Sequence, residues 1–175
     1  MKKILVLIAG AMLIAACSSP NREKEVKEIA KHEQALSTID IGNDDSEAIA
    51  MLEMYRKFAA DFPEDSLTPG YLMRAAEMSI NMGMIPQALS LIDTVVSLYP
   101  GYEDIAGCYF MKGYAYESGE QYDSAKAAYT YFVENYPDHY LANDTRKMLD
   151  YIGMTPEQMF EAIMNNANDK GLATD

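Results

Sequence analysis

Apolar and aromatic residues recur at helical spacing along most of this chain, in runs that close at an aromatic–proline pair. The pairs are Phe62-Pro63, Tyr99-Pro100 and Tyr136-Pro137, and each follows the previous one after 37 residues. A proline stops a helix because it lacks an N–H and biases the preceding residue away from the helical region. The pattern therefore predicts amphipathic helices over residues 49–62, 86–99 and 124–136.

Matching places within these three helices hold similar residues. Counted back from each proline, apolar or aromatic residues recur five and eight places earlier: Phe58, Val95 and Phe132, then Tyr55, Ile92 and Tyr129. Twelve places before the last two prolines stand Ala88 and Ala125, small residues that suit the close approach of a second helix, while the first unit has Met51 there. A unit that repeats in this way indicates a stacked repeat architecture.

A further helix precedes each of the two later ones. The pattern predicts these helices over residues 69–82 and 105–118, with the small residues Ala76 and Gly113 at matching places. Each ends near a glycine, Gly83 or Gly119, which we expect to take the left-handed conformation that terminates a helix. The unit is thus helix, glycine turn, helix and aromatic–proline break.

Helices are also predicted on both sides of these repeats. Residues 22–37 carry apolar side chains on one face, namely Val26, Ile29, Ala30 and Leu36. We interpret them as the opening helix of the first unit, followed by a loop at residues 40–45; a coiled-coil arm is the alternative. Residues 141–152 and 155–165 are expected to form a final helix pair, whose second helix begins at the capping sequence Thr155-Pro156-Glu157-Gln158.

The last full unit resembles the tetratricopeptide repeat (TPR). The residues that carry the resemblance are Tyr109, Gly113, Tyr116, Tyr122, Ala125, Tyr129, Phe132 and Pro137, with Lys112 where the family usually has leucine. The resemblance implies an all-α fold, a TPR-like α-solenoid of about three helix pairs plus a C-terminal capping helix pair. We expect this helical domain to span residues 22–165 and residues 166–175 to be a disordered tail.

The resemblance also implies a binding groove, because the first helices of TPR units line a concave face that holds an extended or helical peptide. The family's groove-facing places fall on Met73, Glu77, Ile80 and Asn81 in the middle unit, and on Phe110, Tyr114, Glu117 and Ser118 in the last. For Phe110 and Tyr114 the alternative is burial against the next helix pair. We expect the core to contain Tyr109, Tyr116, Tyr129 and Phe132.

The beginning of the chain has the pattern of an export signal. Met1-Lys2-Lys3 precedes an apolar run over residues 4–16, which has the length of a signal and is too short to span a bilayer. The run closes in Leu13-Ile14-Ala15-Ala16-Cys17, which looks like a lipobox. We therefore predict a lipoprotein signal peptide over residues 1–16, a lipid on Cys17 and a short linker over residues 17–21; an ordinary cleavable signal is the alternative. Ser18 in place of Asp resembles an outer-membrane sorting address, so we expect a chain that is lipid-anchored in the outer membrane and faces the periplasm; the inner membrane and exposure at the cell surface are the alternatives.

Composition excludes several classes of function. With 14 Lys and Arg against 27 Asp and Glu, the net charge of −13 repels nucleic acid. The sequence has no phosphate loop, dinucleotide fingerprint or zinc motif, so we expect no catalytic site, cofactor or metal. An enzyme would need His32 or His139 beside a carboxylate cluster in a cleft. Cys108 is expected to be a small buried helix residue.

Together these features predict a membrane-anchored, non-catalytic scaffold or adaptor of the bacterial envelope. Its repeats are similar in subtype to those of the barrel-assembly TPR lipoprotein and the Tol-Pal-associated periplasmic TPR protein. The expected partner is another envelope protein or peptide segment, held in the groove during outer-membrane protein assembly or envelope organisation. The alternative is a small-ligand or glycan-binding surface lipoprotein for uptake, which would have a closed, aromatic pocket in place of an extended, open groove.

Overall fold

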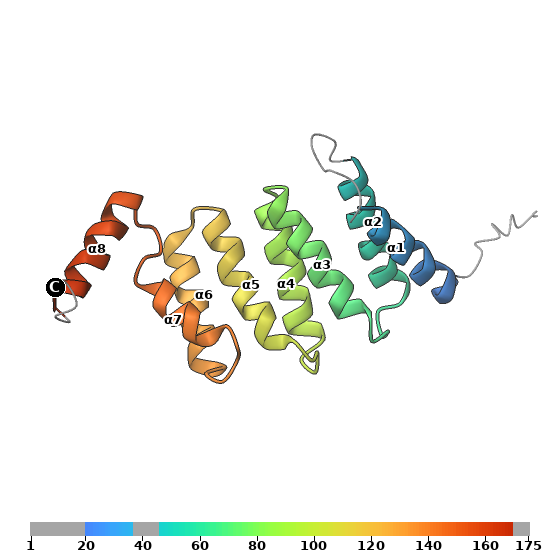
Figure 1. Ribbon diagram of the computed structural model, residues 1–175. Coiled ribbons are helices and arrows are strands. Elements are labelled where there is room, and N and C mark those ends of the chain that lie inside the picture. The colour runs from blue at the N-terminus through green and yellow to red at the C-terminus, as the bar shows by residue number, and fades with distance from the viewer. Residues whose placement is uncertain (1–19, 37–45, 170–175) are drawn as a thin grey trace, which may run out of the picture.

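The computed structural model describes residues 20–36 and 46–169 and is all-helical over that part of the chain (Figure 1). Its helices are α1 (Arg22–Leu36), α2 (Ser46–Asp61), α3 (Thr68–Asn81), α4 (Ile85–Leu98), α5 (Ile105–Ser118), α6 (Tyr122–Asn135), α7 (Ala142–Leu149) and α8 (Pro156–Asp169). The predicted signal peptide, Cys17 and the loop at residues 40–45 lie outside the described residues. No helix within the described ranges is both long and apolar enough to cross a bilayer.

The helices stack in a single row. From α1 to α7 each helix packs against the next one along the chain, and α3 also touches α5 (Figure 1). Such a row, in which contacts join only near neighbours, is an α-solenoid. The predicted fold class is confirmed, and α1 packs on α2 as the opening helix of the first unit.

The repeat period is visible in the helix starts. The first helices of successive units begin at Thr68, Ile105 and Ala142, and the second helices begin at Ile85 and Tyr122, in each case 37 residues apart. The predicted ends of α2, α4 and α6 are close to the observed ones, because each of these helices ends directly before its aromatic–proline pair. One difference is α7, which ends at Leu149 rather than at residue 152 because the chain turns there to bury Ile152 against α6.

The core follows the positions that repeat. The large side chains at these positions are buried, with Tyr129 1% exposed and Phe58, Ile92, Val95 and Phe132 fully buried. The small residues at the close helix approaches are fully buried as well: Ala76, Ala88 and Ala125. Gly113 is the tightest of these approaches. A Cβ atom added there would lie 2.5 Å from the ring of Tyr129, so any larger residue must displace this packed ring.

The two helix-ending glycines behave differently. Gly83 has a φ of +71° and terminates α3 as predicted. Gly119 has a φ of −92°, so the prediction of a left-handed residue at this position is wrong, and the left-handed residue is Glu120 with a φ of 57°. The 37-residue period pairs Gly83 with Glu120, not with Gly119. Gly119 is instead closely packed, because a Cβ there would lie 3.1 Å from the Ile85 side chain at the start of α4.

Replacing Glu120 by glycine is expected to stabilise the protein. A non-glycine residue in the left-handed region is strained by roughly 1–2 kcal/mol, whereas glycine costs roughly 0.5–1 kcal/mol in chain entropy. We expect a net gain of about 0.5–1 kcal/mol in the free energy of unfolding, measured by urea titration with an unchanged slope. The matched variant is Gly83→Ala, at the equivalent position after the end of α3, and it should change stability in the opposite direction. Equal effects from both variants would contradict the assignment.

Polar contacts hold α1 in place, with Ile29 as its one buried residue in the described range. The links are Arg22 with Asp65, Glu25 with Lys57 (2.7 Å), and Glu33 with both Arg74 and the hydroxyl of Tyr55 (2.6 Å). The hydrogen bond from Arg22 lowers the pKa of Asp65 below its ordinary value. The first helix is therefore joined to α2 and α3 by these polar links in addition to its apolar face, where Ile29, Val26 and Leu36 pack against the core.

The two C-terminal helices are both present but do not form a packed pair. α7 packs against α6, whereas α8 contacts no other helix of the described chain and follows it at the end of the row (Figure 1). The capping sequence is formed as predicted, since the Thr155 N–H donates to Gln158 (2.9 Å) and the Gln158 N–H donates to the Thr155 hydroxyl (3.3 Å). α8 continues to Asp169, beyond the predicted boundary at residue 165. The rest of the predicted tail, residues 170–175, lies outside the described residues.

Candidate functional site

A groove runs between the first helices of the middle and last units. It has a volume of about 360 Å³ and is lined by Ser66, Leu67, Gly70, Tyr71, Met73, Arg74, Glu77, Tyr102, Glu103, Asp104, Gly107 and Met111. We call this surface the first-helix groove. Its walls come from α3 and α5, and its end from the loop that joins α4 to α5.

The start of α5 shapes one wall of the first-helix groove. Asp104 caps the helix by accepting a hydrogen bond from the Gly107 N–H (3.1 Å). A side chain at position 107 would collide with this cap, because its Cβ would lie 2.4 Å from the Asp104 carboxylate. The bare backbone of Gly107 therefore faces the groove, and Met111 follows one helical turn later on the same side.

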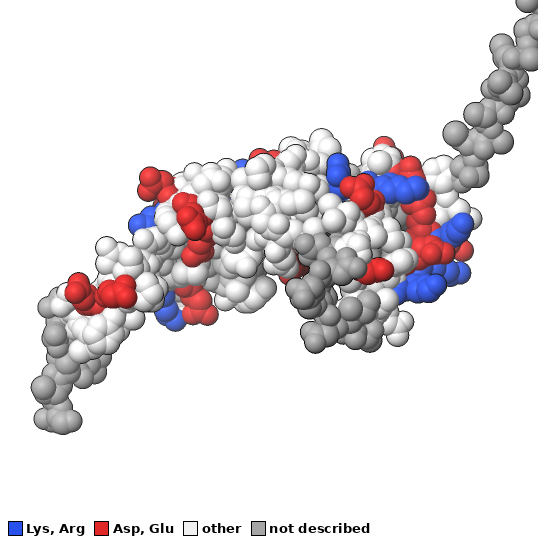
Figure 2. Space-filling model, turned by 90° about the horizontal axis from the view of Figure 1, so that it is seen from above, with Lys and Arg blue, Asp and Glu red and all other residues white. Residues whose placement is uncertain are grey.

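The groove lining combines apolar residues with a majority of acidic over basic side chains. Its cation, Arg74, is paired with Glu33, and its guanidinium lies 5.8 Å from the centre of the Tyr71 ring. The carboxylates of Glu77, Glu103 and Asp104 outnumber it. The same imbalance extends over the rest of the solenoid, since residues 82–169 contain 13 Asp and Glu against four Lys and Arg. Figure 2 shows the basic side chains gathered mainly at the end that holds α1.

Two of the predicted groove residues line the first-helix groove. Met73 is partly buried there, and Glu77 is exposed. Asn81 and Ser118 are exposed at the last residues of α3 and α5. Tyr114 is 41% exposed on α5. These residues remain available to a partner.

The other three predicted residues are engaged in the fold. Ile80 is 5% exposed and packs in the core. Phe110 is half-buried, with its ring 5.4 Å from that of Tyr129 and 5.6 Å from that of Phe132, both on α6, the second helix of its own unit. Glu117 accepts a hydrogen bond from the Tyr129 hydroxyl (2.9 Å).

Sequence reasoning missed Arg74, Gly107 and Met111. The repeat period pairs Arg74 with Met111, one place after the predicted pair of Met73 and Phe110. The 37-residue period therefore already related these two groove residues to each other. A displacement of one residue turns a helical side chain by about 100°, which moves it from the groove to the neighbouring helix.

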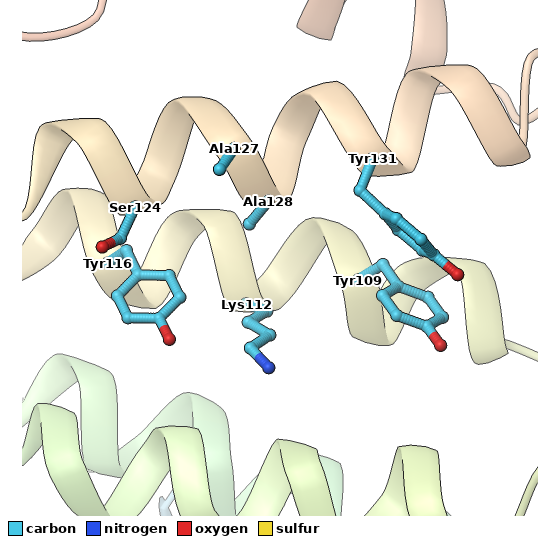
Figure 3. Close-up of a pocket in the computed structure, with 7 residues that line it drawn as sticks. All are labelled: Tyr109, Lys112, Tyr116, Ser124, Ala127, Ala128 and Tyr131. Carbon is cyan, nitrogen blue, oxygen red and sulfur yellow. The ribbon is translucent and has the colours of Figure 1, made fainter.

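A second pocket lies on another face of α5, between that helix and α6. It has a volume of about 370 Å³ and is lined by Tyr109, Lys112, Tyr116, Ser124, Ala127, Ala128 and Tyr131 (Figure 3). We call it the tyrosine groove. Tyr129 and Phe132 are buried as predicted, but Tyr109 and Tyr116 are only partly buried and belong to this surface.

Lys112, the residue that departs from the TPR pattern, lies at the centre of the tyrosine groove. Its ammonium pairs with Asp93 of α4 at 2.6 Å. One unit earlier the same place holds Ala75, which is fully buried. The long side chain of Lys112 instead lines the pocket.

The described residues offer little for chemistry. Cys108 is fully buried as predicted, and burial raises the pKa of its thiol to about 12, so the thiol stays protonated at neutral pH. His32 lies 4.0 Å from Glu47, and His139 lies 3.7 Å from Asp104, so each faces a single carboxylate. Within residues 20–36 and 46–169 no three His, Cys, Asp or Glu side chains cluster as a metal site would require.

Comparison with known families identifies one repeat. Residues 108–139, which run from α5 through α6 to the following loop, match the tetratricopeptide repeat. This is the unit that carries the TPR resemblance in the sequence, so the prediction of a TPR there is confirmed. The chain matches no curated protein and no solved structure. Tetratricopeptide repeats generally act as protein–protein interaction modules, and the solenoid has the architecture for that role.

Proposed function

We propose that this chain is a lipid-anchored, non-catalytic adaptor of the bacterial envelope that holds a segment of another envelope protein in the first-helix groove. The observation that carries the proposal is the groove itself, an open trough between α3 and α5 lined by methionines and carboxylates. First helices of stacked pairs are the surface that such solenoids use for extended or helical peptides.

The lining indicates the chemistry of the bound segment. Met73 and Met111 provide flexible apolar contacts that adapt to different side chains. Glu77, Glu103 and Asp104 attract Lys or Arg, and electrostatic attraction of this kind raises the rate at which a partner binds. The expected partner segment therefore combines apolar and basic side chains.

The predicted lipid on Cys17 gives the groove its place of action. Diacylglycerol on the thiol and a further acyl chain on the amine contribute roughly 0.8 kcal/mol per buried methylene, which is ample for stable anchoring. Tethering raises the effective concentration of the groove toward neighbouring envelope proteins. Even a weak groove serves under these conditions, which fits a role in outer-membrane protein assembly or envelope organisation.

The alternative function, uptake of a small ligand or glycan, has less support from the first-helix groove. A sugar site needs exposed aromatic faces, whereas Tyr71 is 8% exposed here and stacks on Tyr55. The other tyrosine of the groove, Tyr102, is partly buried, and methionines and carboxylates line the groove beside it. These side chains suit a peptide better than a neutral sugar.

The groove assignment predicts a charge-dependent loss of the partner. We expect Met73→Ala combined with Glu77→Lys to reduce the amount of crosslinked, co-purified envelope partner on the order of tenfold, because an apolar contact and a carboxylate of the lining are both changed. The measurement is quantitative mass spectrometry after crosslinking in membranes. Asp144→Lys makes the same charge change at a 79% exposed side chain on α7 and should leave the partner set unchanged. An unchanged partner set in the groove variant would refute the proposal.

A further inference from the structure

α8 presents an apolar face that nothing in the described chain covers. Met159, Phe160, Ile163 and Met164 lie one helical turn apart in pairs and are between 38% and 64% exposed. The helix contains acidic residues and no Lys or Arg. Large apolar side chains aligned on one face of a helix usually pack against another surface.

The length of α8 strengthens this expectation. It has 14 residues and makes no contact with another described helix. Isolated helices shorter than about 12–15 residues are marginal in water, because most helical stability in proteins comes from packing of the apolar face. The capping pair of Thr155 and Gln158 defines where α8 begins but does not replace that packing.

The tyrosine groove has the complementary surface. Figure 3 shows Ala127 and Ala128 between Tyr116 at one end and the adjacent rings of Tyr109 and Tyr131 at the other. The alanines leave room for inserted side chains, and tyrosine rings make favourable contacts with methionine sulfur. Lys112 is the one charged residue of this lining and is paired with Asp93, so no carboxylate within the lining opposes the acidic α8.

The chain's own α8 is held away from this groove. Residues 150–155 join α7 to α8, and within them Ile152 is buried against Ala125 and Tyr129 while Gly153 lies against Tyr122. These contacts fix the start of α8 at the α7 side of α6. The tyrosine groove instead lies on the side where Lys112 reaches Asp93 of α4. An α8 that fills the groove must therefore belong to another molecule.

We propose that α8 of one copy docks in the tyrosine groove of a second copy of this chain. Phe160 and Ile163 insert over Ala127 and Ala128, and the carboxylates of α8 lie near Lys112. A membrane surface is a less suitable partner for the apolar face of α8, because helices that lie on anionic membranes carry Lys and Arg on their polar face. This contact is independent of the partner proposed for the first-helix groove.

Co-production of two differently tagged full chains tests the proposal. Two wild-type chains should co-purify. Two chains with Ala127→Glu, which fills the groove with a side chain of the same charge as α8, should co-purify on the order of tenfold less. Two chains with Phe160→Ser and Ile163→Ser should lose the contact to a similar degree. Leu98→Ser, at a 67% exposed leucine outside both surfaces, is the matched control and should have no effect.

The mixed pair gives the decisive outcome. A chain with Ala127→Glu retains a working α8, and a chain with the α8 substitutions retains a working groove, so this pair should co-purify again. Recovery also shows that both variants are folded. Failure of the mixed pair, or retention by two Ala127→Glu chains, would overturn the proposal; the second result would instead indicate pairing of α8 with α8.

Discussion

Replacing Cys17 by alanine is expected to move the chain almost completely from the membrane fraction to the soluble fraction. The lipobox-like sequence ends at this cysteine, and its thiol is the predicted attachment point of the lipid. Loss of all acyl chains removes an anchoring energy of roughly 0.8 kcal/mol for each buried methylene. Fractionation of envelope membranes, followed by immunoblotting, measures the effect.

The second cysteine provides the matched control for this experiment. Cys108 is buried in α5, and Cys108→Ala should leave the chain in the membrane fraction and labelled by radioactive palmitate. The Cys17→Ala variant should carry no label. A Cys17→Ala chain that still sediments with membranes, or a label that depends on Cys108, would contradict the predicted anchor.

Substituting Gly113 by alanine is expected to lower the free energy of unfolding by about 2 kcal/mol. The added Cβ would lie 2.5 Å from the Tyr129 ring, which is 1% exposed and is held by Phe110 and by its hydrogen bond to Glu117. Overpacking of this kind costs about 1–3 kcal/mol, and here the ring has little freedom to move. Alanine also favours the helix by roughly 1 kcal/mol, so the clash must exceed that gain.

Gly70→Ala separates the clash from the change in helix propensity. Gly70 lies in α3, and a Cβ there would meet only the Tyr102 hydroxyl at 3.8 Å, which is an ordinary contact. Its stability should be unchanged or raised by up to about 1 kcal/mol. Urea titration of both variants makes the comparison. If Gly113→Ala is as stable as Gly70→Ala, the close packing of α5 on α6 is not as described.

The repeat period predicted the fold well because its signals are local. A proline ends its helix through its own backbone chemistry, so the ends of α2, α4 and α6 followed from Pro63, Pro100 and Pro137. The helix-ending residue of α5 was missed because Gly119 was matched to Gly83 by residue type. Matching by the 37-residue period would have pointed to Glu120.

Packing between elements was harder to predict than the elements themselves. The capping sequence and apolar spacing of α8 specify a helix but not what that helix packs against, and it stands apart from α7. The site shows the same limit. Phe110 and Met111 are neighbours in sequence, yet Phe110 packs on α6 and Met111 lines the groove, because the rotation of α5 between its neighbours decides which faces α3.

Site-specific photocrosslinking in living cells tests the central claim, that the first-helix groove holds a partner, most directly. A photoreactive residue placed at position 73 or 111 should crosslink to one and the same envelope polypeptide, since the two side chains line opposite walls of the groove. The same residue at position 140, where Tyr140 is 81% exposed in the loop after α6, should give no such product. Crosslinks to that polypeptide from position 140 and none from positions 73 and 111 would contradict the account.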